Sequence, residues 1–128
     1  TYLGGHSSEV AYDILADADK NVYLTGYTLS GDFPVTPDAL QPDWSGGVDV
    51  FCAKLSLAMP PAQALAYATF AGHGGINVGY GIAVAPSGVM YLAGRSQDQQ
   101  FPVTENAFQQ THAGGFSDGF ILVLGKRQ

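Results

Sequence analysis

Short apolar runs separated by turn residues set the pattern of this 128-residue sequence. The first half contains four such runs, at residues 14–17, 22–27, 50–55 and 64–70, and the second half contains three, at residues 82–85, 89–94 and 119–124. The first two runs of each half flank a short turn segment, which is typical of a β-hairpin. No segment keeps a 3.6-residue period of apolar positions, so the sequence predicts an all-β chain.

A long loop separates the second and third predicted strands of each half, and each loop contains one expected helical turn. Thr36 stands directly before Pro37, and the pair suits the N-cap and the first position of a helix. Thr104 holds the same place before Glu105 in the second loop. We therefore expect Thr36 and Thr104 each to cap a single helical turn.

The two halves are copies of one unit. Matched pairs 68 positions apart include Phe33/Phe101, Thr36/Thr104, Gln41/Gln109 and Gly46/Gly114. One inserted residue then changes the spacing to 69, at which Asp49 matches Asp118. The chain is thus expected to be one segment of two repeats, at about residues 1–68 and 69–128.

Several predicted strands are apolar at consecutive positions, including residues 22–24, 64–68 and 120–124. Both faces of such a strand need cover, because successive side chains point to opposite faces of a sheet. With no helix expected, the cover must come from further sheets. Stacked antiparallel sheets of four strands are the blades of a β-propeller, so the predicted fold is two such blades of an incomplete propeller.

Spaced motifs of the second repeat carry a family resemblance. They are Tyr80-Gly81-Ile82-Ala83-Val84, Pro86-Ser87-Gly88, Met90-Tyr91-Leu92-Ala93-Gly94, Phe101-Pro102-Val103-Thr104, Ala107-Phe108-Gln109, and the Gly114-Gly115 pair before Asp118-Gly119-Phe120. These motifs resemble the SBBP family, the bacterial β-propeller repeat of extracellular and cell-surface proteins. The opening residues Thr1-Tyr2-Leu3-Gly4-Gly5 also resemble its strand end, so the likeness extends over essentially the whole chain, although residues 11–15 lack the two glycines of the second repeat. The resemblance implies a propeller fold and an extracellular location, and it implies no catalytic residues.

Propellers close with about four to eight blades, and this sequence supplies two. The last predicted blade lacks its outer strand, while residues 1–5 form a stub of that strand type. We predict that Thr1, Tyr2 and Leu3 of one copy complete the last blade of another copy beside Ile121 and Val123, by strand addition. The expected partners are other copies or further propeller repeats, and a head-to-tail contact yields a ring of three or four chains or a filament.

The charge balance excludes some partners. The sequence has eleven acidic and five basic residues, which gives a net charge of −6. Nucleic acid is therefore an unsuitable partner, because binding its phosphates needs a cluster of basic residues on one surface. The longest apolar run, residues 120–124, is too short for a membrane span, so no membrane insertion is expected. The acidic, lysine-poor composition favours a secreted protein. The single cysteine, Cys52, is interpreted as a buried strand residue.

Three groups of polar residues are candidate metal or ligand sites. Asp17, Asp19 and Asn21 alternate like the ligands of a calcium loop, but the second repeat lacks them, and a hairpin turn is the favoured interpretation. Asp49 and Asp118 are interpreted as structural loop clamps rather than metal ligands. The histidines lack zinc-ligand spacing, and no nucleophile–base signature indicates an enzyme.

The two long loops offer ligand-binding candidates. Trp44 and His112 hold matching positions, and Asp32 and Asp98 lie nearby in the two loops. Phe33 and Phe101 recur within a shared motif, so we expect them to plug the loops onto the sheets. The sequence therefore favours a non-catalytic extracellular scaffold that self-assembles by completing blades between chains. The alternative is a lectin-like or adhesive module that binds carbohydrate or protein through these loops.

Overall fold

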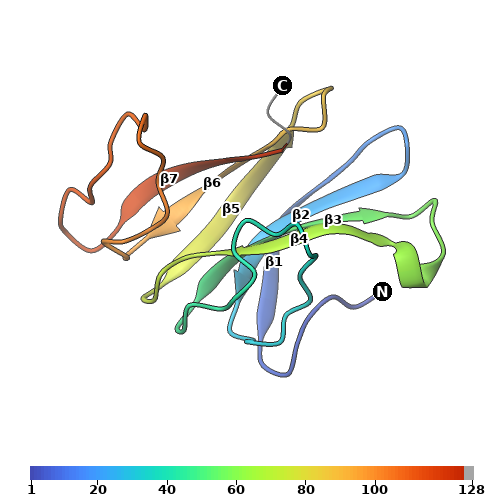
Figure 1. Cartoon of the computed structure of the whole chain (residues 1–128), viewed down its shortest axis with the longest axis horizontal. Coiled ribbons are helices and arrows are strands. Elements are labelled where there is room, and N and C mark those ends of the chain that lie inside the picture. Colours follow the sequence, from blue (N-terminus) through green and yellow to red (C-terminus); the bar gives the residue numbers. More distant parts are fainter. Residues whose placement is uncertain (126–128) are drawn as a thin grey trace.

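The computed structural model describes residues 1–125, in which seven β-strands form two antiparallel sheets (Figure 1). The first sheet contains β1 (Glu9–Ala16), β2 (Asn21–Thr28), β3 (Asp49–Ser56) and β4 (Leu65–Ala71), paired in this order. The second sheet contains β5 (Asn77–Val84), β6 (Met90–Ser96) and β7 (Asp118–Leu124), also paired in order. A 3-10 turn, η1 (Pro61–Gln63), is the only helical element of the described residues. The all-β prediction is confirmed, and neither sheet closes on itself.

The two sheets share one register. Thr28 pairs with Asp49 across β2 and β3, and the matching residues Ser96 and Asp118 pair across β6 and β7. Both first strands carry a β-bulge at the same place, between residues 11 and 13 and between residues 79 and 81. The sequence repeat is therefore a repeat of backbone geometry as well.

The first strand of each sheet begins five residues earlier than predicted. β1 starts at Glu9 and β5 at Asn77, whereas the apolar runs begin at positions 14 and 82. The bulge explains the difference, because an extra residue interrupts the alternation of inward and outward side chains. Asp13 follows the bulge of β1, and its Oδ2 accepts a hydrogen bond of 2.9 Å from the Ile82 amide of β5.

The predicted helical turns are wrong. The Ala39 amide donates to the Thr36 carbonyl at 3.0 Å, which closes a single β-turn, and Ala107 does the same with Thr104 at 3.0 Å. The Thr36 hydroxyl accepts a hydrogen bond from the Ala68 amide of β4 at 3.1 Å. That hydroxyl joins the loop to the neighbouring strand rather than capping a helix.

The two sheets pack face to face around one apolar cluster. The first sheet contributes Tyr23, Val50, Cys52 and Ala71, and the second contributes Ile82, Met90, Leu92, Leu122 and Leu124. Cys52 is buried as predicted, and its Sγ lies 3.7 Å from the Met90 Sδ. Burial raises the pKa of the Cys52 thiol to about 12.

A second cluster lies on the far side of the first sheet. Phe33 reaches down from the β2–β3 loop and packs against Phe51 and Phe70, with ring centroids 4.9 Å and 5.9 Å away. In the second sheet Phe101 stacks on Phe120 at 4.6 Å. Both phenylalanines plug their loops onto a sheet, as the sequence predicts.

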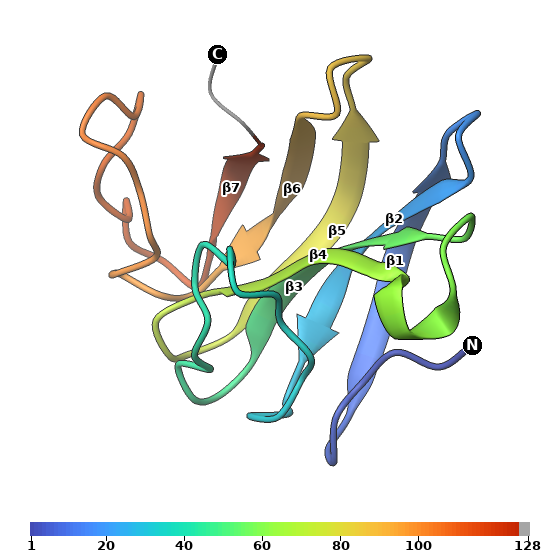
Figure 2. The same cartoon turned by 45° about the vertical axis from the view of Figure 1, so that its right-hand side comes forward.

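Residues 1–5 form no strand, and the N-terminal segment lies on the opposite side of the molecule from β7 (Figures 1 and 2). The long loop of the second repeat projects beyond β7, also away from the N-terminus. Within residues 1–125, no helix has the length and apolar character that crossing a membrane requires.

Candidate interaction surfaces

The face of the first sheet that points away from the second sheet is here named the first outer face. It is defined by Ile14, Val22, Leu24 and Leu55, which line a hollow of about 480 Å³. Ile14 is 63% exposed, whereas its repeat equivalent Ile82 is only 8% exposed. Ile82 is buried because the first sheet covers it, and nothing among residues 1–125 covers Ile14 in the same way.

The opposite end of the stack carries the second outer face, defined by Tyr91, Ile121 and Val123. Ile121 is 80% exposed, while its repeat equivalent Cys52 is 1% exposed against the second sheet. Tyr91 is 45% exposed, and its equivalent Tyr23 is 2% exposed. The internal interface joins one face of the first sheet to one face of the second. Each outer face is therefore equivalent to one of these two faces but has no sheet packed against it among residues 1–125.

The outer edge of β7 is unpaired among residues 1–125. In the first sheet the third strand pairs with β4, but the second sheet has no fourth strand within residues 1–125. A hollow of about 690 Å³ lies between the β7 edge and the loop that precedes it. Residues that line this hollow include Phe101, Thr104, Gln109, His112, Phe120 and Val123. We name this hollow the β7 slot.

The residues expected to fill such an edge are exposed or held elsewhere. Tyr2 is fully exposed, and Leu3 packs beside the cluster on the first outer face. The segment is anchored by His6, whose amide donates to Asp32 Oδ1 at 2.9 Å and whose ring contacts Asp32 Oδ2. The hydrogen bond and charge of Asp32 raise the pKa of His6, and the His6 hydrogen bonds lower the pKa of Asp32.

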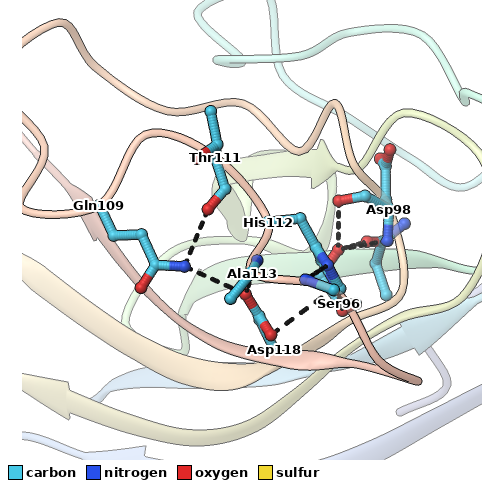
Figure 3. Close-up of polar contacts among 9 residues, drawn as sticks. Ser96, Asp98, Gln109, Thr111, His112, Ala113 and Asp118 are labelled. Atoms are coloured by element: carbon cyan, nitrogen blue, oxygen red, sulfur yellow. Dashed lines mark hydrogen bonds and ion pairs between the residues drawn. The ribbon is translucent and has the colours of Figure 1, made fainter.

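The four ligand-binding candidates form two groups, one in each long loop. Asp32 is the partner of His6, and Trp44 lies against Gly31, where an added Cβ would be 3.2 Å from the ring. The other group is His112 and Asp98, which meet around Ser96 (Figure 3). The sequence places Trp44 and His112 at equivalent positions. In the structure Trp44 lies beside Gly31, which follows β2, and His112 lies beside Ser96, the last residue of β6.

The environment of His112 and Asp98 is enclosed. His112 Nε2 lies 3.3 Å from the Ser96 carbonyl, and the Asp98 amide donates to Ser96 Oγ at 3.0 Å. Asp98 Oδ1 accepts from the Gln100 amide at 2.7 Å. Its Oδ2 is buried without a hydrogen-bond partner among residues 1–125.

Asp49 and Asp118 act as clamps on the long loops. Asp49 Oδ2 accepts hydrogen bonds from the Ser45 amide at 2.8 Å and from Gln41 Nε2 at 3.4 Å. Asp118 Oδ2 repeats the arrangement with Gln109 Nε2 at 3.1 Å (Figure 3). Burial raises the pKa of Asp49.

The segment with calcium-like spacing forms a hairpin turn. Asp17 Oδ1 accepts from the Asp19 and Asn21 amides at 2.9 Å and 3.0 Å, and Asp17 Oδ2 accepts from Asn21 Nδ2 at 2.9 Å. The hydrogen bonds from Asn21 lower the pKa of Asp17. Among residues 1–125, no cluster of three or more His, Cys, Asp or Glu side chains is placed to hold a metal ion. Calcium at Asp17, Asp19 and Asn21 stays a prediction.

Sequence reasoning missed two positions that organise these surfaces. Gln109 lines the β7 slot, and Asp13 bonds the second sheet. The recurrence of Gln41 as Gln109 was a usable signal, because a polar residue repeated inside a variable loop has a structural partner to keep. Asp13 gives no such signal, since Gly81 stands at the matching position.

Comparisons with known proteins give one match. Neither the curated proteins nor the solved structures that were searched contain a significant match to this chain. The family model described as SBBP, β-propeller repeat, matches residues 1–34, which span the N-terminal segment, β1, β2 and Phe33. The resemblance to the SBBP β-propeller repeat is thus confirmed by a family match over the first 34 residues of the chain.

Proposed function

We propose that this chain is a two-blade segment of a β-propeller and a non-catalytic structural protein that associates head-to-tail. The first outer face of one copy packs on the second outer face of the next copy. The observation that carries the proposal is that residues at equivalent positions of the two repeats differ in solvent exposure. Ile14 is exposed whereas its equivalent Ile82 is buried, and Ile121 is exposed whereas its equivalent Cys52 is buried.

The internal interface supplies a template for the contact between copies. Between the two sheets, Cys52 faces Met90, and the same geometry would set Ile121 of one copy against Val22 of the next. Fully burying an isoleucine or valine side chain stabilises an interface by about 1.5–3 kcal/mol. Large apolar faces of this kind on a small protein mark association sites.

The symmetry of the assembly follows from the use of two different faces. A contact between unlike faces leaves one free face at each end, so it repeats until a ring closes or a filament grows. Rings of three or four copies supply six or eight sheets, within the usual range of about four to eight propeller blades.

An extracellular setting is part of the proposal. Two observations support it: the net charge of −6, which suits a secreted protein, and the match to the SBBP β-propeller repeat. A high net charge of one sign opposes unspecific aggregation while leaving the uncharged outer faces free to pair.

Light scattering on a size-exclusion column tests the proposal. The wild-type chain is expected to elute as an assembly of several copies, with a mass well above the 13.4 kDa of a single chain. Ile14→Asp and Ile121→Asp are each expected to reduce that mass, because each places a charge inside the contact. Met59→Asp is the matched control, since Met59 is exposed but lies on neither outer face. A wild-type mass of 13.4 kDa at every concentration would overturn the proposal.

A further inference from the structure

The long loop of the first repeat holds the outer strand of its sheet through Gln41. The Gln41 amide donates to Thr69 Oγ1 at 2.9 Å, and the Phe70 amide donates to the Gln41 carbonyl at 3.2 Å. The Gly72 amide donates to Gln41 Oε1 at 3.0 Å. One glutamine therefore contacts Thr69 and Phe70 of β4 and Gly72 directly after the strand, a pattern of Thr, an aromatic residue, one intervening residue and Gly.

Each of these positions has a physical reason for its residue type. The Thr69 hydroxyl accepts a hydrogen bond from the Gln41 backbone amide. A valine at position 69 has no hydroxyl and would leave that amide without a partner. The Phe70 ring completes an aromatic group with Phe33 and Phe51. At Gly72 an added Cβ would lie 2.5 Å from Asp49 Oδ1, so a side chain there would displace the carboxylate from its hydrogen bonds with Ser45.

The second repeat has the same receptor without its strand. Gln109 Nε2 donates to the Thr111 carbonyl at 2.8 Å, as Gln41 Nε2 donates to the Asp43 carbonyl at 2.9 Å, so the two side chains are held alike. The backbone amide, carbonyl and Oε1 of Gln109 make no hydrogen bond within residues 1–125. Phe101 and Phe120 stack without a third ring, and both are only partly buried.

We propose that the β7 slot is a receptor for a strand of the pattern Thr-aromatic-x-Gly, and that its occupant is the segment Thr1-Tyr2-Leu3-Gly4 of a second copy. This segment matches residues 69–72 at the repeat spacing, with Thr, an aromatic ring and Gly in the same places. The assignment of the occupant rests on the head-to-tail association proposed above.

The register of β3 and β4 fixes the register of the docked strand. Cys52 pairs with Thr69 and Phe51 with Phe70, so Thr1 lies opposite Ile121 and Tyr2 opposite Phe120. Tyr2 then supplies the third ring beside Phe101. Val123 corresponds to Lys54, which pairs with Tyr67, and it therefore lies beyond the reach of Thr1.

An N-terminal segment that fills the slot comes from another copy. Within one chain the N-terminal segment and β7 lie on opposite sides of the molecule (Figures 1 and 2). Tyr2 is fully exposed in the single chain, so its ring loses no packing when it enters the slot. Docking also closes the open β7 edge, which unpaired would be a site of unspecific strand pairing.

A peptide titration tests the receptor directly. The probe is a synthetic peptide with the sequence of residues 64–73, added to the ¹⁵N-labelled full chain carrying Ile14→Asp to limit self-association. The amide signals of Gln109 and Ile121 are expected to shift. The same peptide carrying Thr69→Val and Gly72→Val is expected to bind about tenfold more weakly or worse, because it loses a hydrogen bond and adds a clash.

Variants of the receptor provide the control. Gln109→Ala is expected to weaken peptide binding about tenfold. Gln100→Ala is expected to leave binding unchanged, because Gln100 is exposed, lies outside the lining of the slot and bonds Asp98 only through its backbone amide. Equal affinity of the two peptides, shifts confined to another surface, or no binding would each overturn the strand receptor.

The occupant is tested in the assembled protein. Removing residues 1–5 and the variant Tyr2→Ser are each expected to lower the assembly mass at a given concentration. If both variants assemble like the wild type, the N-terminal segment is not the occupant and association through the outer faces still stands. If the peptide binds the slot but the wild-type chain stays a monomer, head-to-tail association is wrong and the receptor stands.

Discussion

Ile14 and Ile82 occupy the same position in the two repeats, yet Ile14 is open to solvent and Ile82 lies inside the interface between the sheets. A charge at position 82 would be buried without a partner, whereas a charge at position 14 would be hydrated. Ile82→Asp is therefore expected to lower the free energy of unfolding by about 4 kcal/mol or more. Ile14→Asp is expected to change it by about 0.5 kcal/mol at most.

Urea denaturation at low protein concentration measures both variants. Working at low concentration separates the stability of the single chain from that of the assembly. Similar losses in the two variants would show that Ile14 belongs to the core of the single chain, which contradicts its role on an outer face.

The repeat explains how much of this fold is readable from sequence. The strands of each hairpin and the packing of Phe33 were predictable, because apolar runs and repeated aromatic motifs report burial directly. The bulge after Ala11 was not, because it depends on how two strands pair rather than on either strand alone. Thr36 failed as a helix cap for a similar reason, since its partner Ala68 is 32 residues away.

The candidate site likewise has one part that the sequence predicts and one part that depends on contacts between distant segments. Ile121 was predicted as an association residue because the second repeat has one predicted strand fewer than the first, and that role stays a prediction. The role of Gln109 required the hydrogen bonds that Gln41 makes to β4, and those contacts appear only once the loop is folded against the strand.

The hairpin turns of the two sheets differ at one backbone position. Lys20 has a φ of 63°, in the left-handed region, and its repeat equivalent Gly88 has a φ of 89°. Lys20→Gly is expected to stabilise the chain by about 0.5–1 kcal/mol, because glycine adopts this conformation without steric cost. Thermal unfolding should show a rise in Tm of about 2–5 °C. Lys20→Ala is the control, and an equal rise in that variant would contradict the backbone explanation.

The contact between His6 and Asp32 is expected to depend on pH. The pKa of His6 is raised above its ordinary value of 6.5, so the charged contact is complete below pH 6.5 and is lost as pH rises through the folded pKa. The pKa of Asp32 is lowered below 3.8, so its part is present above pH 3.8 and is lost as pH falls through the folded value. The N-terminal segment is therefore anchored best between these limits.

An NMR titration of the His6 ring checks this dependence. Asp32→Asn is expected to return the His6 pKa toward 6.5. Asp38→Asn, in the same loop, is expected to leave the His6 titration unchanged. An unaltered midpoint in the Asp32 variant would show that the carboxylate does not hold the imidazole.

The Cys52 thiol is expected to be unreactive in the folded chain. Its pKa of about 12 and its burial against Met90 keep it protonated and inaccessible at pH 8, and the thiolate is the reactive form. A disulfide-exchange reagent should label the thiol only after urea is added. Rapid labelling of the native protein would mean that the two sheets separate readily in solution.

Association through two unlike outer faces is tested most directly by mixing two blocked variants and measuring the mass by sedimentation equilibrium. Ile14→Asp keeps the second outer face, and Ile121→Asp keeps the first, so each variant alone should sediment as a monomer of 13.4 kDa. An equimolar mixture is expected to form a one-to-one dimer of twice that mass and to grow no further. A mixture that stays monomeric while the wild type assembles, or a dimer formed by either variant alone, would contradict head-to-tail association.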